Sequence, residues 1–251
     1  MTDHLRADHL APFKDYFASE HDPDARGGKM WTTFRKRLDR STSSAVGPAA
    51  SETKFSRGEV LNFAADDSAP LLDVIGAVLC WGGVDYRNVE RLRPRLDNVL
   101  HLCTGLRAGT SSPRQAFSEL RALRMSGKLP GLGPAYYTKL IYFLSHRHRS
   151  KCQTAYIMDQ WASCSINVLT GRDVVLMNFN IPYGGRATTF SVSDLNRAEN
   201  YDRFCRHMNE LIEELKPLSP GGDVSPEQLD AAMMDVSRAG WRQYLIGQRR
   251  Q

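Results

Sequence analysis

The stretch LPGLGPAYYTKLIYFL (residues 129–144) places two glycines and a proline directly before a strongly apolar helix. Gly131 and Gly133 permit a positive φ and the close approach of another backbone. Pro134 suits the first turn of a helix, where its missing N–H costs no hydrogen bond. The free N–H groups and the positive dipole end of that helix would face an anion, and phosphate is the natural occupant. The alternative is a tight turn in which the glycines serve packing only.

The surrounding sequence is mostly helical in pattern. Ser112 and Pro113 form an N-cap and first position for a helix that ends near Gly127, just before the quoted stretch. Further out, Ser56 followed by Glu59 predicts a capping box at the start of a helix. PLLDVIGAVLCW (70–81) is apolar on all sides, which predicts a buried helix. The only strand-like region is 173–192, with a possible turn at its PYGG. We therefore expect a mainly α fold with a small β hairpin.

The composition is that of an ordinary globular chain, with 41% hydrophobic and 24% charged residues in 251. No apolar run approaches the roughly 20 residues needed to cross a membrane, and the N-terminus lacks the apolar region of an export signal. We expect a cytoplasmic protein with no membrane contact. The five cysteines match no zinc or iron–sulfur spacing, so we expect free thiols, no metal and no cofactor.

The net charge of +5 and the pI near 9.0 favour a polyanionic partner only mildly. A well-solvated basic surface explains them as well. Basic residues do gather in three clusters, at 29–40, 87–95 and 146–151.

Two motifs carry a resemblance to a known family. K-L-P-G-L-G between two helices resembles the helix-hairpin-helix of the HhH-GPD DNA glycosylase superfamily, and Asp159 in YIMDQW fits the aspartate that follows this element. The connector SHRHRSKCQT makes the spacing to Asp159 longer than is familiar. LCWGGVDYRNVERL (79–92) is similar to the family's intercalating turn and following helix, although Trp81-Gly82-Gly83 replaces the usual polar turn.

The resemblance covers about residues 56–170 and implies a two-lobed helical DNA-glycosylase fold. The implied organisation has an N-terminal segment, 1–55, that packs on the second lobe. A helix-hairpin-helix core at 56–170 follows, and 171–251 completes the second lobe with a hairpin and helices. The general layout resembles the 8-oxoguanine-glycosylase branch.

The resemblance also implies catalytic roles. Asp159 would stabilise positive charge that develops on the deoxyribose as the N-glycosidic bond breaks, and it could also serve as an ordinary helix N-cap. The Schiff-base lysine of bifunctional relatives is replaced by Ala135. Lys139 lies one turn later on the same helix face and is the second catalytic candidate. The alternative for Lys139 is a lysine whose head reaches solvent at the helix surface.

The remaining candidates would contact DNA or the extruded base. Hairpin and turn residues are candidates for DNA contact: Lys128, Leu129, Gly131, Gly133, Tyr136 and Trp81. Three aromatic residues are candidates for the base pocket: Trp161, Tyr183 and Trp241. Each aromatic residue has core packing as its alternative, and for Trp81 we favour that alternative.

The resemblance therefore implies a DNA glycosylase that flips a base out of duplex DNA and excises it, leaving an abasic site. The substrate alternatives are an oxidised purine, for DNA repair, and a hypermodified phage cytosine, for antiviral defence. Strand cleavage by Lys139 is a further alternative. A competing hypothesis is a non-catalytic helix-hairpin-helix module that only binds DNA. We expect a monomer that associates with the bacterial-type nucleoid through its DNA partner.

Overall fold

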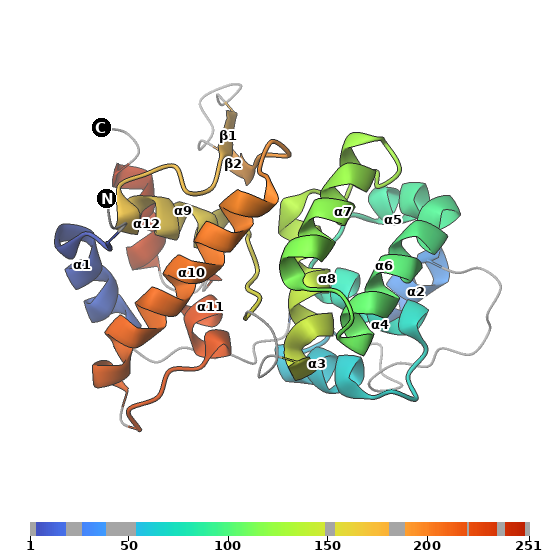
Figure 1. Ribbon diagram of the computed structural model, residues 1–251, viewed down its shortest axis with the longest axis horizontal. Helices are drawn as coiled ribbons and strands as arrows, with labels where there is room; N and C mark the ends of the chain where they lie inside the picture. The colour runs from blue at the N-terminus through green and yellow to red at the C-terminus, as the bar shows by residue number, and fades with distance from the viewer. Residues whose placement is uncertain are drawn as a thin grey trace. The chain divides into compact units, whose positions relative to one another are not determined.

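The computed structural model describes residues 4–18, 27–38, 54–148, 154–180, 189–219, 221–234 and 239–248. This part of the chain is mainly α-helical and carries a two-stranded antiparallel sheet, which confirms the predicted fold class (Figure 1). It forms two compact units: a terminal unit, Met1–Pro23 with Tyr156–Gln251, and a central unit, Asp24–Ala155.

These unit bounds differ from the three segments expected from the sequence. Trp31 and Phe34 are fully buried in the central unit, so this part of the 1–55 segment packs with residues of the 56–170 segment. The helix that follows Asp159 belongs to the terminal unit. The functional roles given to the three segments stay predictions.

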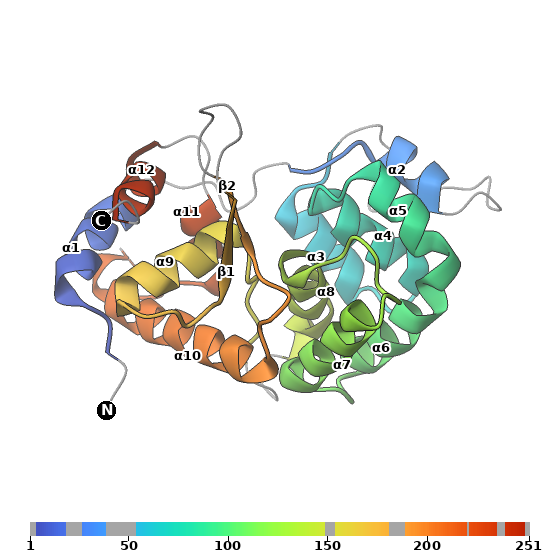
Figure 2. The ribbon, with the colours of Figure 1, turned by 90° about the horizontal axis from the view of Figure 1, so that it is seen from above.

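The central unit is built from helices that surround one apolar helix. That helix is α4 (Leu71–Trp81), in which every residue from Asp73 to Trp81 is buried. It packs against α2 (Trp31–Leu38), α3 (Arg57–Ala65), α6 (Leu96–Ala108) and α8 (Pro134–Ser145), as Figure 2 shows. Complete burial of a Val, Leu or Ile side chain contributes roughly 1.5–3 kcal/mol, so the all-round apolar pattern of α4 makes it the centre of this core. The unit also contains α5 (Tyr86–Leu92), α7 (Pro113–Met125) and short 3-10 turns at Arg93–Arg95 and His146–His148.

A buried ion pair attaches α2 to this core. Arg35 of α2 pairs with Asp73 of α4, and their side chains are only 8% and 5% exposed. Loss of one partner would leave a buried charge uncompensated, which typically costs about 3–5 kcal/mol. Helix α2 is therefore an integral part of the central unit.

The local start signals in the sequence are confirmed. Ser56 and Glu59 form a reciprocal capping box at the start of α3. Ser112 accepts a hydrogen bond from the Gln115 backbone, and Pro113 occupies the first position of α7. Helix α6, by contrast, was not singled out by the sequence analysis.

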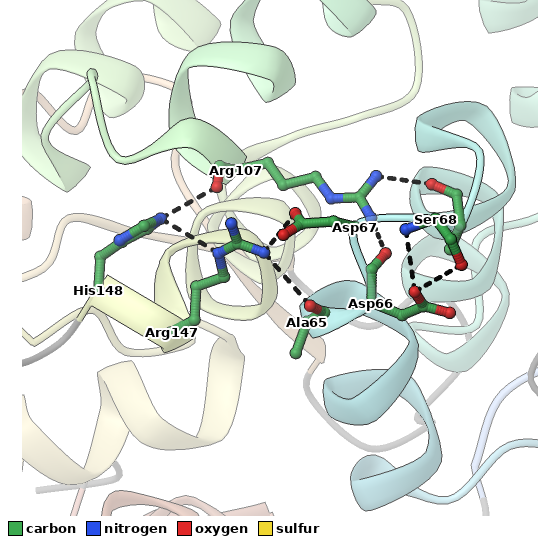
Figure 3. Close-up of polar contacts among 8 residues, drawn as sticks. Ala65, Asp66, Asp67, Ser68, Arg107, Arg147 and His148 are labelled. Carbon is green, nitrogen blue, oxygen red and sulfur yellow. Dashed lines mark hydrogen bonds and ion pairs between the residues drawn. The ribbon is translucent and has the colours of Figure 1, made fainter.

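The end of the central unit's helical bundle is tied by a polar network (Figure 3). Arg107 of α6 donates to the carbonyl oxygen of Asp66, directly after α3. Arg147 donates to the Asp67 carboxylate at 2.6 Å, and His148 Nε2 lies 3.0 Å from the Arg107 carbonyl oxygen. The Arg147 hydrogen bond lowers the pKa of Asp67. Part of the basic cluster at 146–151 is therefore used to join the ends of α3 and α6.

The terminal unit is organised around α9 (Gln160–Thr170). This helix packs against α1 (Ala7–Phe17), α10 (Ala198–Leu215), α11 (Pro226–Met234) and α12 (Ala239–Gln248). Strands β1 (Met177–Asn180) and β2 (Thr189–Val192) pair antiparallel, with Met177 opposite Val192, and both contact α9. The hairpin prediction is confirmed for the strands, while the PYGG turn lies outside the described residues.

None of the helices in the described ranges is both long and apolar enough to span a membrane.

Candidate functional site

The segment between α7 and α8 forms a compact hairpin. Gly127 has a φ of 72°, and the backbone N–H groups of Lys128 and Leu129 both donate to the Leu123 carbonyl, at 2.9 and 3.1 Å. These bonds close the end of α7. Leu129 and Leu132 are fully buried while Lys128 is exposed, so the hairpin is anchored by its leucines and presents its lysine to solvent.

The two glycines of L-P-G-L-G have different backbone conformations. Gly131 has a φ of 75°, in the left-handed region that favours glycine. Gly133 is extended, with φ −82° and ψ −176°, and is the N-cap of α8. Of the two, only Gly131 therefore uses the positive φ that the sequence permitted at both.

The start of α8 offers unused hydrogen-bond donors. Within the described part of the chain, the backbone N–H groups of Gly131, Gly133 and Ala135 make no hydrogen bond. Pro134 has no N–H to satisfy. Unpaired N–H groups at a helix N-terminus bind anions, and the helix dipole adds to the attraction. This geometry suits a phosphate oxygen.

The two motifs that carried the family resemblance meet at the hairpin. A Cβ placed on Gly131 would lie 2.4 Å from Cγ of Asn88, which belongs to the N-V-E segment of α5. The Asn88 side chain thus fills the space that the absent side chain of Gly131 leaves. Both motifs are visible in the sequence, but their contact is not predictable from it, because nothing local joins residues so far apart in the chain.

Lys139 lies beside the Gly82 turn and is only 6% exposed. Its Nζ donates to the Ala135 carbonyl at 3.1 Å and sits 5.5 Å from the centre of the Tyr136 ring. A Cβ on Gly82 would meet Lys139 Cδ at 2.8 Å, so the aliphatic chain packs directly on this glycine. Lys139 is therefore not a solvent-exposed surface lysine. Its ammonium group is held one turn from the position where Ala135 replaces the family's lysine.

Tyr136 is half-buried next to the start of α5. Burial raises its pKa, and the nearby Asp85 carboxylate adds to the rise. Asp85 is the N-cap of α5 and accepts a hydrogen bond from the Arg87 backbone at 2.9 Å. Tyr136, Asp85 and Lys139 thus bring the turn after α4 together with the first turn of α8.

Trp81, the last residue of α4, packs as a core residue. It is 8% exposed, its ring meets Phe143 edge-on at 5.1 Å, and the Arg57 guanidinium lies 5.1 Å from its ring centre. This packing matches the core alternative for Trp81. A contact between Trp81 and DNA stays a prediction.

Asp159 is the N-cap of α9 in the terminal unit. Its Oδ1 accepts hydrogen bonds from the backbone N–H groups of Trp161 and Ala162, both at 2.9 Å. The residue is 9% exposed, and no described residue donates a hydrogen bond to Oδ2. The cap therefore fixes the carboxylate through one oxygen and leaves the other without a protein partner among the described residues.

The aromatic candidates for the base pocket have different environments. Trp161 is part-buried, lies edge-on to Phe190 at 5.0 Å and has the Arg242 guanidinium 4.2 Å from its ring centre. Trp241 is 2% exposed and donates to the Ser165 hydroxyl at 3.0 Å, so its ring belongs to the core of the terminal unit. Tyr183 lies outside the described residues.

The predicted site residues therefore divide between the two compact units. The central unit holds the hairpin residues with Tyr136, Lys139 and Trp81, and the terminal unit holds Asp159, Trp161 and Trp241. Among the residues that the structure describes, no group of three His, Cys, Asp or Glu side chains is arranged to hold a metal ion.

Comparison with known proteins gives one result. The model of the family described as "Putative 8-oxoguanine DNA glycosylase OGG-like protein" matches residues 28–234, which is most of the chain. No curated protein and no solved structure matches the chain. The matched range includes the hairpin, the N-V-E segment and Asp159. The chain therefore belongs to this family of OGG-like proteins.

Proposed function

We propose that the protein is a DNA glycosylase that extrudes a damaged or modified base from duplex DNA and cleaves its N-glycosidic bond. Membership of the OGG-like family supports this proposal. The observation that carries it furthest is the start of α8, where the backbone N–H groups of Gly131, Gly133 and Ala135 are unused and available to a phosphate. Such a contact positions a duplex without reading its sequence.

The chemistry that we assign to Asp159 follows from its two oxygens. Cleavage of the bond to the base develops positive charge on the deoxyribose, which a fixed carboxylate stabilises. Because Oδ1 is held by two backbone N–H groups, Oδ2 keeps a defined direction without rearrangement. The base leaves with the bonding electrons and takes up a proton, while a water molecule adds to the sugar carbon and loses a proton.

Lys139 gives this proposal a second form. If the neutral lysine amine attacks the sugar carbon in place of water, the base leaves with the bonding electrons. The sugar ring then opens as the ring oxygen takes up a proton and the nitrogen loses one, which gives a Schiff base from which strand cleavage can follow. The buried position of Nζ beside Ala135 and Tyr136 supports a chemical role, since a buried lysine amine is a costly side chain to retain for packing.

Asp159→Asn is the sharpest test of the enzyme proposal. Asparagine caps a helix about as well as aspartate, so the variant should fold and keep its affinity for duplex DNA. Base release, measured by mass spectrometry, should fall by at least about 100-fold, as typical for loss of a charge-stabilising group. Asp97→Asn, an exposed residue in the first turn of α6, removes the same charge elsewhere and should release base at the wild-type rate. Unchanged release by Asp159→Asn would refute the role of Asp159.

The substrate is tested with two kinds of DNA. The description of the family names 8-oxoguanine, an oxidised purine, so duplex that contains 8-oxoguanine comes first. Phage DNA with hypermodified cytosines tests the alternative. Borohydride trapping of a protein–DNA adduct that disappears in Lys139→Met would establish the lyase form, whereas abasic product without an adduct would establish simple hydrolysis.

The competing proposal is a DNA-binding module without catalysis. It is favoured by the N-cap role of Asp159 and by Ala135 at the lysine position, since both features are explained without chemistry. Duplex binding that persists while the wild type releases no base from either DNA would establish this alternative.

A further inference from the structure

Two of the three basic clusters in the sequence are brought together by the fold. Helix α2 carries part of the first cluster, α5 carries part of the second, and the two helices pack side by side (Figures 1 and 2). Arg37 of α2 forms an ion pair with Glu90 of α5 at 2.5 Å, and its guanidinium lies 5.0 Å from the Tyr86 ring centre. The Nζ of Lys29 approaches the same ring, at 5.7 Å.

Most of the positive charge on these helices faces solvent. We define the basic face as five exposed residues: Lys36, Arg37, Arg87, Arg91 and Arg95. The Arg87 side chain is 85% exposed. Two carboxylates lie among these residues: Glu90 pairs with Arg37, and Asp85, the N-cap of α5, pairs with Arg87 at 3.4 Å. The basic face therefore carries five positive charges against two carboxylates, which leaves an excess of positive charge.

The third cluster differs in this respect. Arg147 donates to the Asp67 carboxylate and to the Ala65 carbonyl, and His148 is packed against Gly109. These side chains join helix ends, as described above. The fold therefore uses Arg147 and His148 to hold helix ends together, whereas it does not use the exposed arginines of α5 for that purpose.

The basic face begins directly beside the hairpin. Asn88, whose side chain fills the space at Gly131, lies between Arg87 and Arg91 on α5. From Arg87 to Arg91 the helix advances roughly 6 Å at 1.5 Å per residue, and Arg95 follows in the next 3-10 turn. At about 3.4 Å of duplex axis per phosphate on one strand, the distance from Arg87 to Arg91 matches about two phosphates.

We propose that the basic face is a second binding surface for the sugar–phosphate backbone of duplex DNA, continuous with the hairpin. This inference rests on the proposed function and adds a footprint outside the helix-hairpin-helix. Arginines spaced along one helix recognise phosphates without regard to base sequence. The surface therefore contributes affinity and register for any duplex, whether or not it contains a substrate base.

The test is the salt dependence of binding to an undamaged duplex. Each phosphate contact contributes about 0.9 to the slope of log K against log salt concentration. Arg87→Gln/Arg91→Gln should therefore reduce the slope by about 1.8 relative to the wild type. The matched control is Arg203→Gln/Arg206→Gln, which removes two exposed arginines one turn apart on α10. We expect the control to keep the wild-type slope, and circular dichroism should show both variants folded.

An unchanged slope for the α5 variant would overturn the proposal, as would an equal reduction in the control, which would indicate a general effect of net charge. Tighter binding of double-stranded RNA than of DNA, lost in the α5 variant, would instead assign the face to another partner and overturn it too. Base release is measured separately on substrate duplex. If the α5 variant reduces the salt slope while the wild-type protein releases no base, the binding surface is supported and the enzyme proposal fails. If the wild-type protein releases base while the α5 variant leaves the salt slope unchanged, the enzyme proposal is supported and the binding surface is refuted.

Discussion

Substitution of Gly131 by alanine tests the contact between the hairpin and α5. Alanine at this position would adopt a positive φ, which costs about 1–2 kcal/mol for a residue with a side chain. Its Cβ would also lie 2.4–2.5 Å from three atoms of the Asn88 side chain, one of them the Cβ on its backbone. Because that part of Asn88 cannot turn away, the backbone must shift, and overpacking of this kind costs a further 1–3 kcal/mol, roughly.

Gly127→Ala is the matched control. Gly127 has a φ of 72°, almost the same as at Gly131, but a Cβ there meets nothing within 4 Å. Both variants share the backbone strain and the reduced entropy of the unfolded chain. The difference between them therefore isolates the contact with Asn88, and we expect Gly131→Ala to be less stable by about 1–3 kcal/mol.

Calorimetry measures this difference as a shift in Tm of about 2–4 °C for each kcal/mol in a chain of this size. Asn88→Gly removes all three clashing atoms, so Gly131→Ala should lower Tm by less in that background. Equal losses for Gly127→Ala and Gly131→Ala would refute the contact. So would additive losses for Asn88→Gly and Gly131→Ala, because residues in direct contact should show coupling.

Three other predictions follow from local geometry. Asp159→Ala, unlike Asp159→Asn, should lower the unfolding free energy by about 0.5–2 kcal/mol in urea denaturation, because it removes the cap of α9. The pKa of Asp67 is lowered from 3.8 in the folded chain, so its contribution to stability is present above that value and is lost as the pH falls through the folded pKa. In Tm measurements from pH 5 to pH 2, Arg147→Gln should reduce this acid sensitivity, and an unchanged pH profile would contradict the pairing. Burial raises the pKa of the Cys80 and Cys205 thiols to about 12. Peptide mapping after iodoacetamide treatment at pH 8 should therefore find both unmodified in the native protein and labelled after unfolding.

Local sequence signals were sufficient where the structure depends on neighbours in the chain. The helix starts at Ser56 with Glu59 and at Ser112 with Pro113 are as predicted, because capping joins residues only two or three apart. Asp159 takes the N-cap position that the sequence offered as an alternative role. Helix α6 also has a signal in the sequence that was not used. Its buried residues recur at helical spacing: Leu96, Val99, Cys103 and Leu106.

Contacts between distant segments could not be predicted in the same way. Nothing in the composition of the hairpin indicates that Asn88 fills the space at Gly131, or that Lys139 packs on Gly82. Such contacts depend on how α5 and α8 cross the core. The sequence also could not show which of Gly131 and Gly133 has the positive φ, because glycine permits either conformation. In the structure Gly133 is the extended N-cap of α8, and Gly131 has the positive φ. The basic clusters were visible in the sequence, whereas their meeting on α2 and α5 required the fold.

The packing of Lys139 on Gly82 has a consequence for variation within the family. The glycine determines how close the lysine stem can approach α4, and hence how far Nζ extends along its own helix. A side chain at position 82 would displace the amine without any change to the lysine. We therefore expect the two positions to change together in related sequences, with a bulkier residue after α4 accompanied by a shorter or uncharged residue in place of Lys139.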